Sequence, residues 1–205
     1  MAKELPKHIV LTEANSTQLV GEVTDASIQA VIDDISRADP SKPYYLYLRS
    51  PGGEILAGNR LVEFLKGTEI QVEVIVQEAA SMAAVITESV KVRHITSTGF
   101  VMFHHAQLGV QGDIDQVAAR VGFAQQLQEV LDEGIAERMG LSIEEFKKKE
   151  GFEWFLNSHR ALKENAIDDV VVVSCDPSMK GKQRDAVGVG LFGVPTHELR
   201  PVCPL

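Results

Sequence analysis

The sequence predicts an α/β protein with a mostly parallel β-sheet, and three observations support this. Runs of β-branched and aromatic residues alternate with segments of helical periodicity. Turn-forming clusters, such as Asp-Pro-Ser-Lys-Pro at residues 39–43, separate the two kinds of segment. The chain has 205 residues, 44% of them hydrophobic, which is enough for one sizeable core. Alternating strands and helices favour right-handed crossovers, so ligand-binding groups belong at the carboxyl ends of the strands.

The first half of the chain reads as three strand–helix cycles. Thr24 or Asp25 can cap a helix over residues 26–38, which the prolines of residues 39–43 end. A Ser-Pro-Gly-Gly turn at residues 50–53 precedes an amphipathic helix over residues 55–66. A third helix is expected to begin at Ser81. The expected strands cover residues 18–23, 44–48, 70–76, 101–104 and 170–173.

The second half is dominated by one long helix. From Asp113 or Asp115 to about Met139, apolar residues recur at helical spacing, and Gly140 is a natural stop. Ser142 is a suitable cap for a further helix. The apolar positions of the long helix are numerous for a peripheral helix, which indicates a partner surface, although ordinary core packing would explain them too.

Charge and composition exclude several classes of function. The net charge is −9 and the one basic cluster is Lys147-Lys148-Lys149, so no nucleic-acid partner is expected. No apolar stretch approaches the length of a membrane span or a signal peptide, which predicts a cytoplasmic protein. Cys175 and Cys203 show neither CxxC spacing nor a nearby histidine pair, so we expect no disulfide, no metal and no cofactor.

The most informative segment is Glu-Ala-Ala-Ser-Met-Ala-Ala at residues 78–84. It places Ser81 among small residues behind an apolar strand, where a substrate backbone can approach closely. A serine hydroxyl is a weak nucleophile, so this interpretation requires a base and an oxyanion site elsewhere. A serine that only caps a helix is the simpler alternative.

Both requirements have candidates at the ends of other predicted strands. His104 can act as base, and the N–H groups of Gly53 and Met82 can form an oxyanion hole, with Gly52 as an alternative donor. Taken singly, a glycine pair is more often a turn, and a histidine is more often a packed or surface residue. Their common position at strand ends is what favours a shared site.

These segments resemble the Clp protease proteolytic subunit, ClpP, a ring-forming serine peptidase. The resemblance lies in Tyr-Leu-Tyr-Leu-Arg-Ser-Pro-Gly-Gly at residues 45–53, Ala-Ala-Ser-Met-Ala at 79–83 and Val-Met-Phe-His at 101–104. It covers about residues 18–173 and implies a ClpP/crotonase-like fold of repeated β-β-α and βαβ units with a long protruding handle helix after Gly109 and Gly112. Residues 1–17 then form an N-terminal segment, 18–176 the peptidase domain and 177–205 an irregular tail.

The resemblance assigns catalytic roles. It implies that Ser81 is the nucleophile and His104 the general base, with Gly53 and Met82 as the oxyanion donors. The segments at residues 155–158 and 161–168 resemble those that follow the family's catalytic aspartate, and this alignment places Glu153 at the aspartate position. Glu150 is the nearest substitute for this acid.

Two adjacent histidines, His104 and His105, are candidates for the general base. His104 is followed by His105-Ala106, where the family usually has Gln-Pro, and the residues before it fix the alignment on His104. In a strand, His105 would point to the opposite side. The other histidines are interpreted as surface or structural residues: His8, His94, His159 and His197.

The resemblance implies a serine endopeptidase that cleaves polypeptide substrates through an acyl-enzyme inside stacked heptameric rings. An AAA+ unfoldase is the implied partner, although the chain before Gln18 is shorter than the family's axial loops. Three alternatives remain open. They are a catalytically impaired ring subunit with a scaffold or regulatory role, a phage head-maturation protease, and a crotonase-type acyl-CoA enzyme, which shares the oxyanion arrangement without needing Ser81.

Overall fold

The computed structural model describes residues 6–189 and 195–205, and its architecture is a curved, mostly parallel sheet with helices on one side. The seven strands run in the order β1-β7-β5-β4-β3-β2, and β6 pairs antiparallel with β5. All other neighbours in this sheet are parallel. The strands are β1 (His8–Leu11), β2 (Ser16–Val20), β3 (Tyr44–Ser50), β4 (Val72–Ala80), β5 (Val92–Phe103), β6 (Trp154–Asn157) and β7 (Asp169–Cys175). The predicted fold class is confirmed.

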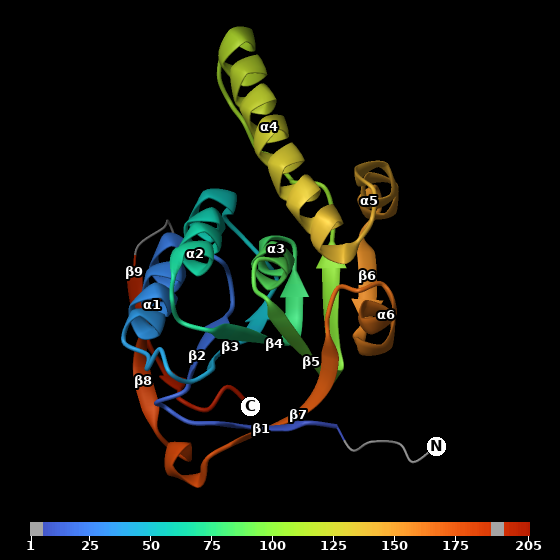
Figure 1. The fold of residues 1–205 in the computed structure, drawn as a ribbon. Helices are drawn as coiled ribbons and strands as arrows, with labels where there is room; N and C mark the ends of the chain where they lie inside the picture. The colour runs from blue at the N-terminus through green and yellow to red at the C-terminus, as the bar shows by residue number, and fades with distance from the viewer. Residues whose placement is uncertain (1–5, 190–194) are drawn as a thin grey trace.

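Three helices cover the central strands, and a fourth projects from the body (Figure 1). The covering helices are α1 (Asp25–Ser36), α2 (Ile55–Gly67) and α3 (Met82–Glu88). Each buries an apolar stripe on the sheet; in α1 this stripe is Ile28, Val31 and Ile35. The projecting helix is α4 (Ile114–Met139), and it is followed by α5 (Ile143–Glu150) and α6 (Ser158–Lys163).

The helix ends follow the predicted capping signals. The Thr24 side chain accepts a hydrogen bond from the Ser27 N–H at the start of α1. Gly140 ends α4 with a left-handed φ of 73°, and Ser142 caps α5 in a reciprocal pair with Glu145. These local interactions need no tertiary context, which is why the sequence predicts them.

The base of α4 is packed, whereas the rest of the helix is not. Its buried residues all lie in the last two turns, at Asp132, Ile135, Ala136 and Met139. Polar contacts hold the same end, because the Asn165 amide donates a 3.2 Å hydrogen bond to the Met139 carbonyl oxygen. The helix is therefore anchored at its C-terminal end.

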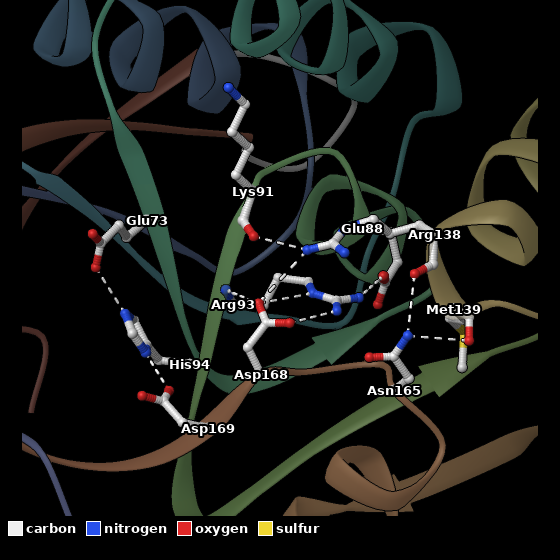
Figure 2. A network of polar contacts seen from close by, with 10 residues as sticks. All are labelled: Glu73, Glu88, Lys91, Arg93, His94, Arg138, Met139, Asn165, Asp168 and Asp169. Atoms are coloured by element: carbon white, nitrogen blue, oxygen red, sulfur yellow. Dashed lines mark hydrogen bonds and ion pairs between the residues drawn. The ribbon is translucent and has the colours of Figure 1, made fainter.

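Strand β5 is much longer than the predicted strand over residues 101–104. Its first half contains polar residues, and Figure 2 shows where they find partners. The buried Arg93 guanidinium donates a 2.8 Å hydrogen bond to Asp168 and pairs with Glu88, while the buried His94 ring lies between Glu73, at 2.8 Å, and Asp169. Buried polar groups need such partners. Local periodicity does not predict a strand here, because this half is polar and three of the four partners lie 21 or 75 residues away in the sequence.

The C-terminal region corrects two expectations. Residues 177–205 were expected to be irregular, but β8 (Gln183–Val189) pairs antiparallel with β9 (Pro195–Pro201). Cys175 and Cys203 were expected to be unpaired, but they form a disulfide across a sequence separation of 28 residues. The physical reason is that the β8–β9 pair returns the chain to the end of β7. An ion pair of 2.9 Å between Arg184 and Asp34 also attaches β8 to α1.

Two short strands also went unpredicted. β1 lies within the expected N-terminal segment and forms an edge of the sheet on β7, and β6 has only four residues. Short edge strands carry little periodicity. Within residues 6–189 and 195–205, no helix combines the length and apolar character needed to cross a membrane.

Candidate active site

Ser81 lies on a tight turn between β4 and α3. Its backbone has φ 55° and ψ −125°, a left-handed conformation that is unfavourable for a residue with a side chain. The Ser81 N–H donates a 2.9 Å hydrogen bond to the Met102 carbonyl oxygen on β5, which fixes the turn against the neighbouring strand. Such a strained strand-to-helix turn is typical of an exposed nucleophile.

The loop after β3 packs directly against this turn. Gly52 has a φ of +96°, and a Cβ atom there would come within 2.7 Å of the Ala80 carbonyl oxygen. At Gly53, with a φ of +147°, a Cβ atom would come within 2.4 Å of the Val23 carbonyl oxygen. Neither position can hold a side chain without displacing backbone atoms. The Pro-Gly-Gly turn therefore brings its peptide groups next to Ser81.

The peptide groups around Ser81 include two N–H donors without partners. Among the described residues, the N–H groups of Gly53 and Met82 donate no hydrogen bond. The Gly52 N–H, in contrast, donates to the Ser50 hydroxyl at 3.1 Å, so it is already engaged. Two free donors on either side of a serine are the arrangement that an oxyanion hole requires.

His104 follows the last residue of β5 and is half-buried. It lines a cavity of about 350 Å³ together with Ser81, Gly53 and Met82. The four residues thus converge from three strand ends, as the strand order predicts. No hydrogen bond joins Ser81 to His104 in the described part of the chain.

Glu153 is exposed and does not line the cavity. It precedes β6, and the antiparallel register pairs Phe103 with Trp154, so the next position on each strand is His104 and Glu153. Both residues lie just beyond the last pair of this ladder, and no ion pair connects them within residues 6–189 and 195–205.

A comparison with protein families decides the relationship. The family model described as Clp protease matches residues 7–174, which is most of the chain. The chain belongs to the Clp protease family. The match begins one residue before β1 and ends one residue before Cys175, so the disulfide and the β8–β9 pair lie at its end and beyond it.

Within this Clp protease family fold, the cavity contains two acidic residues that were not predicted to belong together. Asp132 on α4 and Glu150 on α5 are only 4% and 2% exposed. Burial raises the pKa of Glu150 to about 8, and the nearby Asp132 carboxyl adds to the shift; burial also raises the pKa of Asp132. A signal was present in the sequence, because Asp132 lies at helical spacing from the apolar Ile135, Ala136 and Met139.

His105 points toward these acids and not toward the serine. Its Nδ1 atom lies 2.8 Å from the Gln128 amide nitrogen and 3.4 Å from a Glu150 carboxyl oxygen. His105 is exposed and does not line the cavity, whereas His104 does. Of the remaining histidines, His94 is buried, His8 and His159 are exposed, and the side chain of His197 lies outside the described residues.

The polar residues of the described chain form no metal site. Within residues 6–189 and 195–205, no group of three or more His, Cys, Asp or Glu side chains is arranged to hold a metal ion. The cavity is lined by Ser81 and His104 and by the carboxyl groups of Asp132 and Glu150.

Proposed function

We propose that this member of the Clp protease family is a serine endopeptidase that cleaves polypeptides through an acyl-enzyme. The observation that carries the proposal is the strained turn at Ser81, which exposes a hydroxyl between two unengaged N–H donors in the cavity that His104 also lines. A serine that only caps a helix would need neither a strained φ, nor two free N–H donors, nor a histidine in the same cavity. The arrangement supplies the parts of acyl transfer.

The roles follow from the positions of these groups. His104 takes the Ser81 hydroxyl proton as the oxygen attacks the substrate carbonyl, and the N–H groups of Gly53 and Met82 stabilise the resulting oxyanion. His104 then gives the proton to the leaving amine, which departs and leaves the acyl-enzyme. Water, activated by His104 in the same way, releases the acid and restores Ser81.

Glu153 is the acid that we assign to His104. Glu153 directly precedes β6 and His104 directly follows β5, and we infer that the Glu153 carboxylate orients the imidazole and stabilises its charged form. This role requires the exposed Glu153 side chain to turn toward the ring. Catalytic hydrogen bonds often tighten only when substrate binds.

The exposed apolar residues of α4 support assembly into stacked rings. Ile114, Phe123 and Val130 on this helix are all largely exposed, which is unfavourable for a free surface. Contact with α4 of another copy would bury them, and the rings would enclose the Ser81 cavities in a chamber. An AAA+ unfoldase that feeds polypeptides into the chamber completes this proposal.

Labelling with a fluorophosphonate tests the nucleophile. We expect one adduct per chain on Ser81, located by mass spectrometry of the assembled protein, and hydrolysis of small fluorogenic peptides. Ser81→Ala should abolish both, while Ser89→Ala, after α3, should retain both. No label on Ser81 in the assembled wild type would contradict the proposal and would favour a crotonase-type reaction, which needs no serine nucleophile.

A catalytically impaired ring subunit is the second candidate. The exposed position of Glu153, outside the cavity, favours it. A protein of this kind would still form rings but would hydrolyse no peptide. Peptide hydrolysis by the wild type that is lost in Ser81→Ala would rule it out.

A further inference from the structure

We propose that Asp132 and Glu150 make the cavity beside Ser81 a binding site for a basic side chain, so that the peptidase cleaves after lysine or arginine. This inference rests on the proposed function, because it concerns the residue that supplies the carbonyl attacked by Ser81. It adds a substrate class that neither the serine nor the histidine determines.

The shape of the cavity suits one long side chain. Its volume is about 350 Å³, near the lower end of the range of small-molecule sites. Gly53, Ser81, Met82 and His104 form one part of its lining. Apolar residues form most of the rest, namely Ile55, Val85, Met102, Phe103, Leu131, Ile135 and Phe146. Such walls suit the methylene groups of lysine or arginine.

The two acids are buried without satisfying all of their oxygens. Within the described residues, Asp132 Oδ2 and Glu150 Oε1 have no hydrogen-bond partner although each is inaccessible to water. His105 Nδ1 lies 3.4 Å from Glu150 Oε1, but it is already engaged with the Gln128 amide at 2.8 Å. Buried acceptors without donors destabilise a protein, so their presence in a cavity indicates a ligand that donates.

A cation is the donor that the charges favour. Glu150 titrates at a pKa of about 8 because burial and the Asp132 carboxyl disfavour its charged form. Burial likewise raises the pKa of Asp132, so the two neighbouring acids favour a partner that brings positive charge. The groups that face it are Lys147 on α5, Gln128 on α4 and His105 after β5, and none of them hydrogen-bonds the two free oxygens in the described structure.

Other side chains fit the cavity less well. An apolar side chain would match the walls but would leave the two acids without a cation. An acidic side chain would add a like charge. An ammonium or guanidinium group supplies donors and the opposite charge at once, as buried charge pairs require.

Two matched inactivators test this preference without requiring turnover. Peptidyl diphenyl phosphonates with lysine or norleucine at the reactive residue differ only by the terminal amine, and intact mass reports the rate at which each modifies Ser81. In the assembled wild type, we expect the lysine compound to react about tenfold faster or more, since hydrogen bonds to charged groups are the strong ones.

Variants of Asp132 and Glu150 test whether these two acids cause the preference for lysine. Asp132→Asn and Glu150→Gln keep side-chain shape and each removes one carboxyl group, so each should lower the lysine-to-norleucine rate ratio at pH 8.5, above the pKa of Glu150. Glu133→Gln is the control, because Glu133 neighbours Asp132 on α4 but is exposed; it should keep the wild-type ratio. A wild-type ratio of one or less, or an unchanged ratio in both variants, would overturn the inference.

A fluorophosphonate without a peptide side chain separates the two hypotheses. If it labels Ser81 in all four proteins while lysine shows no advantage, the inference fails and the proposed function stands. If it labels none of them, both fail. The pH adds a check: the lysine advantage should grow between about pH 6.5 and 8.5 as the pair loses its proton, and Glu150→Gln should remove that growth.

Discussion

Gly52 and Ser81 are packed so closely that no side chain fits between them. A Cβ atom on Gly52 would come within 2.6 Å of the Ser81 Cβ atom, and the backbone of Gly52 has a φ of +96°. The loop after β3 and the turn after β4 are therefore built as one unit. A substitution at Gly52 should therefore displace Ser81.

Gly52→Ala is expected to slow fluorophosphonate labelling of Ser81 strongly and to lower the free energy of unfolding by about 2 kcal/mol, through left-handed strain and the clash. Gly67→Ala is the matched control, because no atom lies within 4 Å of a Cβ at Gly67, near the end of α2. It should label at the wild-type rate. Equal labelling rates for the two variants would contradict the packing argument.

The two neighbouring histidines should behave differently. His104→Ala should lower kcat for a fluorogenic peptide by about 10⁴-fold or more, because the general base is lost. His105→Ala should retain most of kcat, since His105 contacts Gln128 and Glu150 and does not line the cavity. If instead His105→Ala were the inactive variant, the assignment of the base would be wrong.

Replacing Glu153 tests the acid of the triad. Glu153→Ala should reduce kcat by about 10³- to 10⁴-fold, because the imidazole loses its orienting carboxylate. Glu153→Asp should recover part of that loss, and Glu144→Ala, an exposed position on α5, should cause none. A Glu153→Ala enzyme with wild-type kcat would remove Glu153 from the mechanism and direct attention to Glu150.

The disulfide between Cys175 and Cys203 should stabilise the C-terminal region. It closes a loop with a sequence separation of 28 residues, for which chain entropy gives a contribution of about 3.6 kcal/mol. Urea unfolding with and without a reducing agent should show this loss in the wild type. The double variant Cys175→Ser with Cys203→Ser should start from the lower stability and be insensitive to reductant.

The stability of the folded chain should fall as the pH rises from about 4.5 to 8. Burial raises the pKa of Glu150 from 4.5 to about 8, so in this window the folded protein keeps a proton that the unfolded chain has lost. The free energy of unfolding then decreases with pH. In Glu150→Gln, the free energy of unfolding should decrease by about 2–4 kcal/mol less than in the wild type across this pH range. Urea titrations at several pH values measure it, and parallel curves for both proteins would contradict it.

Elements whose signals are local could be predicted from the sequence. Helix α1 has its own cap at Thr24, α4 has its stop at Gly140, and the apolar run in β4 needs no partner to be recognised. The first half of β5 could not be predicted in this way. Its Arg93 and His94 are buried only because Asp168 and Asp169, 75 residues away in the sequence, meet them in the fold (Figure 2).

The same distinction applies to the site. Ser81, Gly53 and His104 follow predicted strands, so the parallel arrangement was enough to bring them together. Asp132 and Glu150 belong to helices, where an acidic residue is normally interpreted as facing solvent. The helical spacing of Asp132 from Ile135 and Met139 places it on the apolar face of α4, but the packing of that face against α5 and the sheet depends on the tertiary fold.

Helix α4 is packed against the body of the protein only at its C-terminal end. Its 26 residues span about 39 Å at 1.5 Å per residue, and its buried residues all lie in the last two turns. Asp132 is the first of these buried residues along the helix and also lines the cavity. We therefore expect a partner bound at the far end of α4 to act on the cavity through the same helix that carries Asp132.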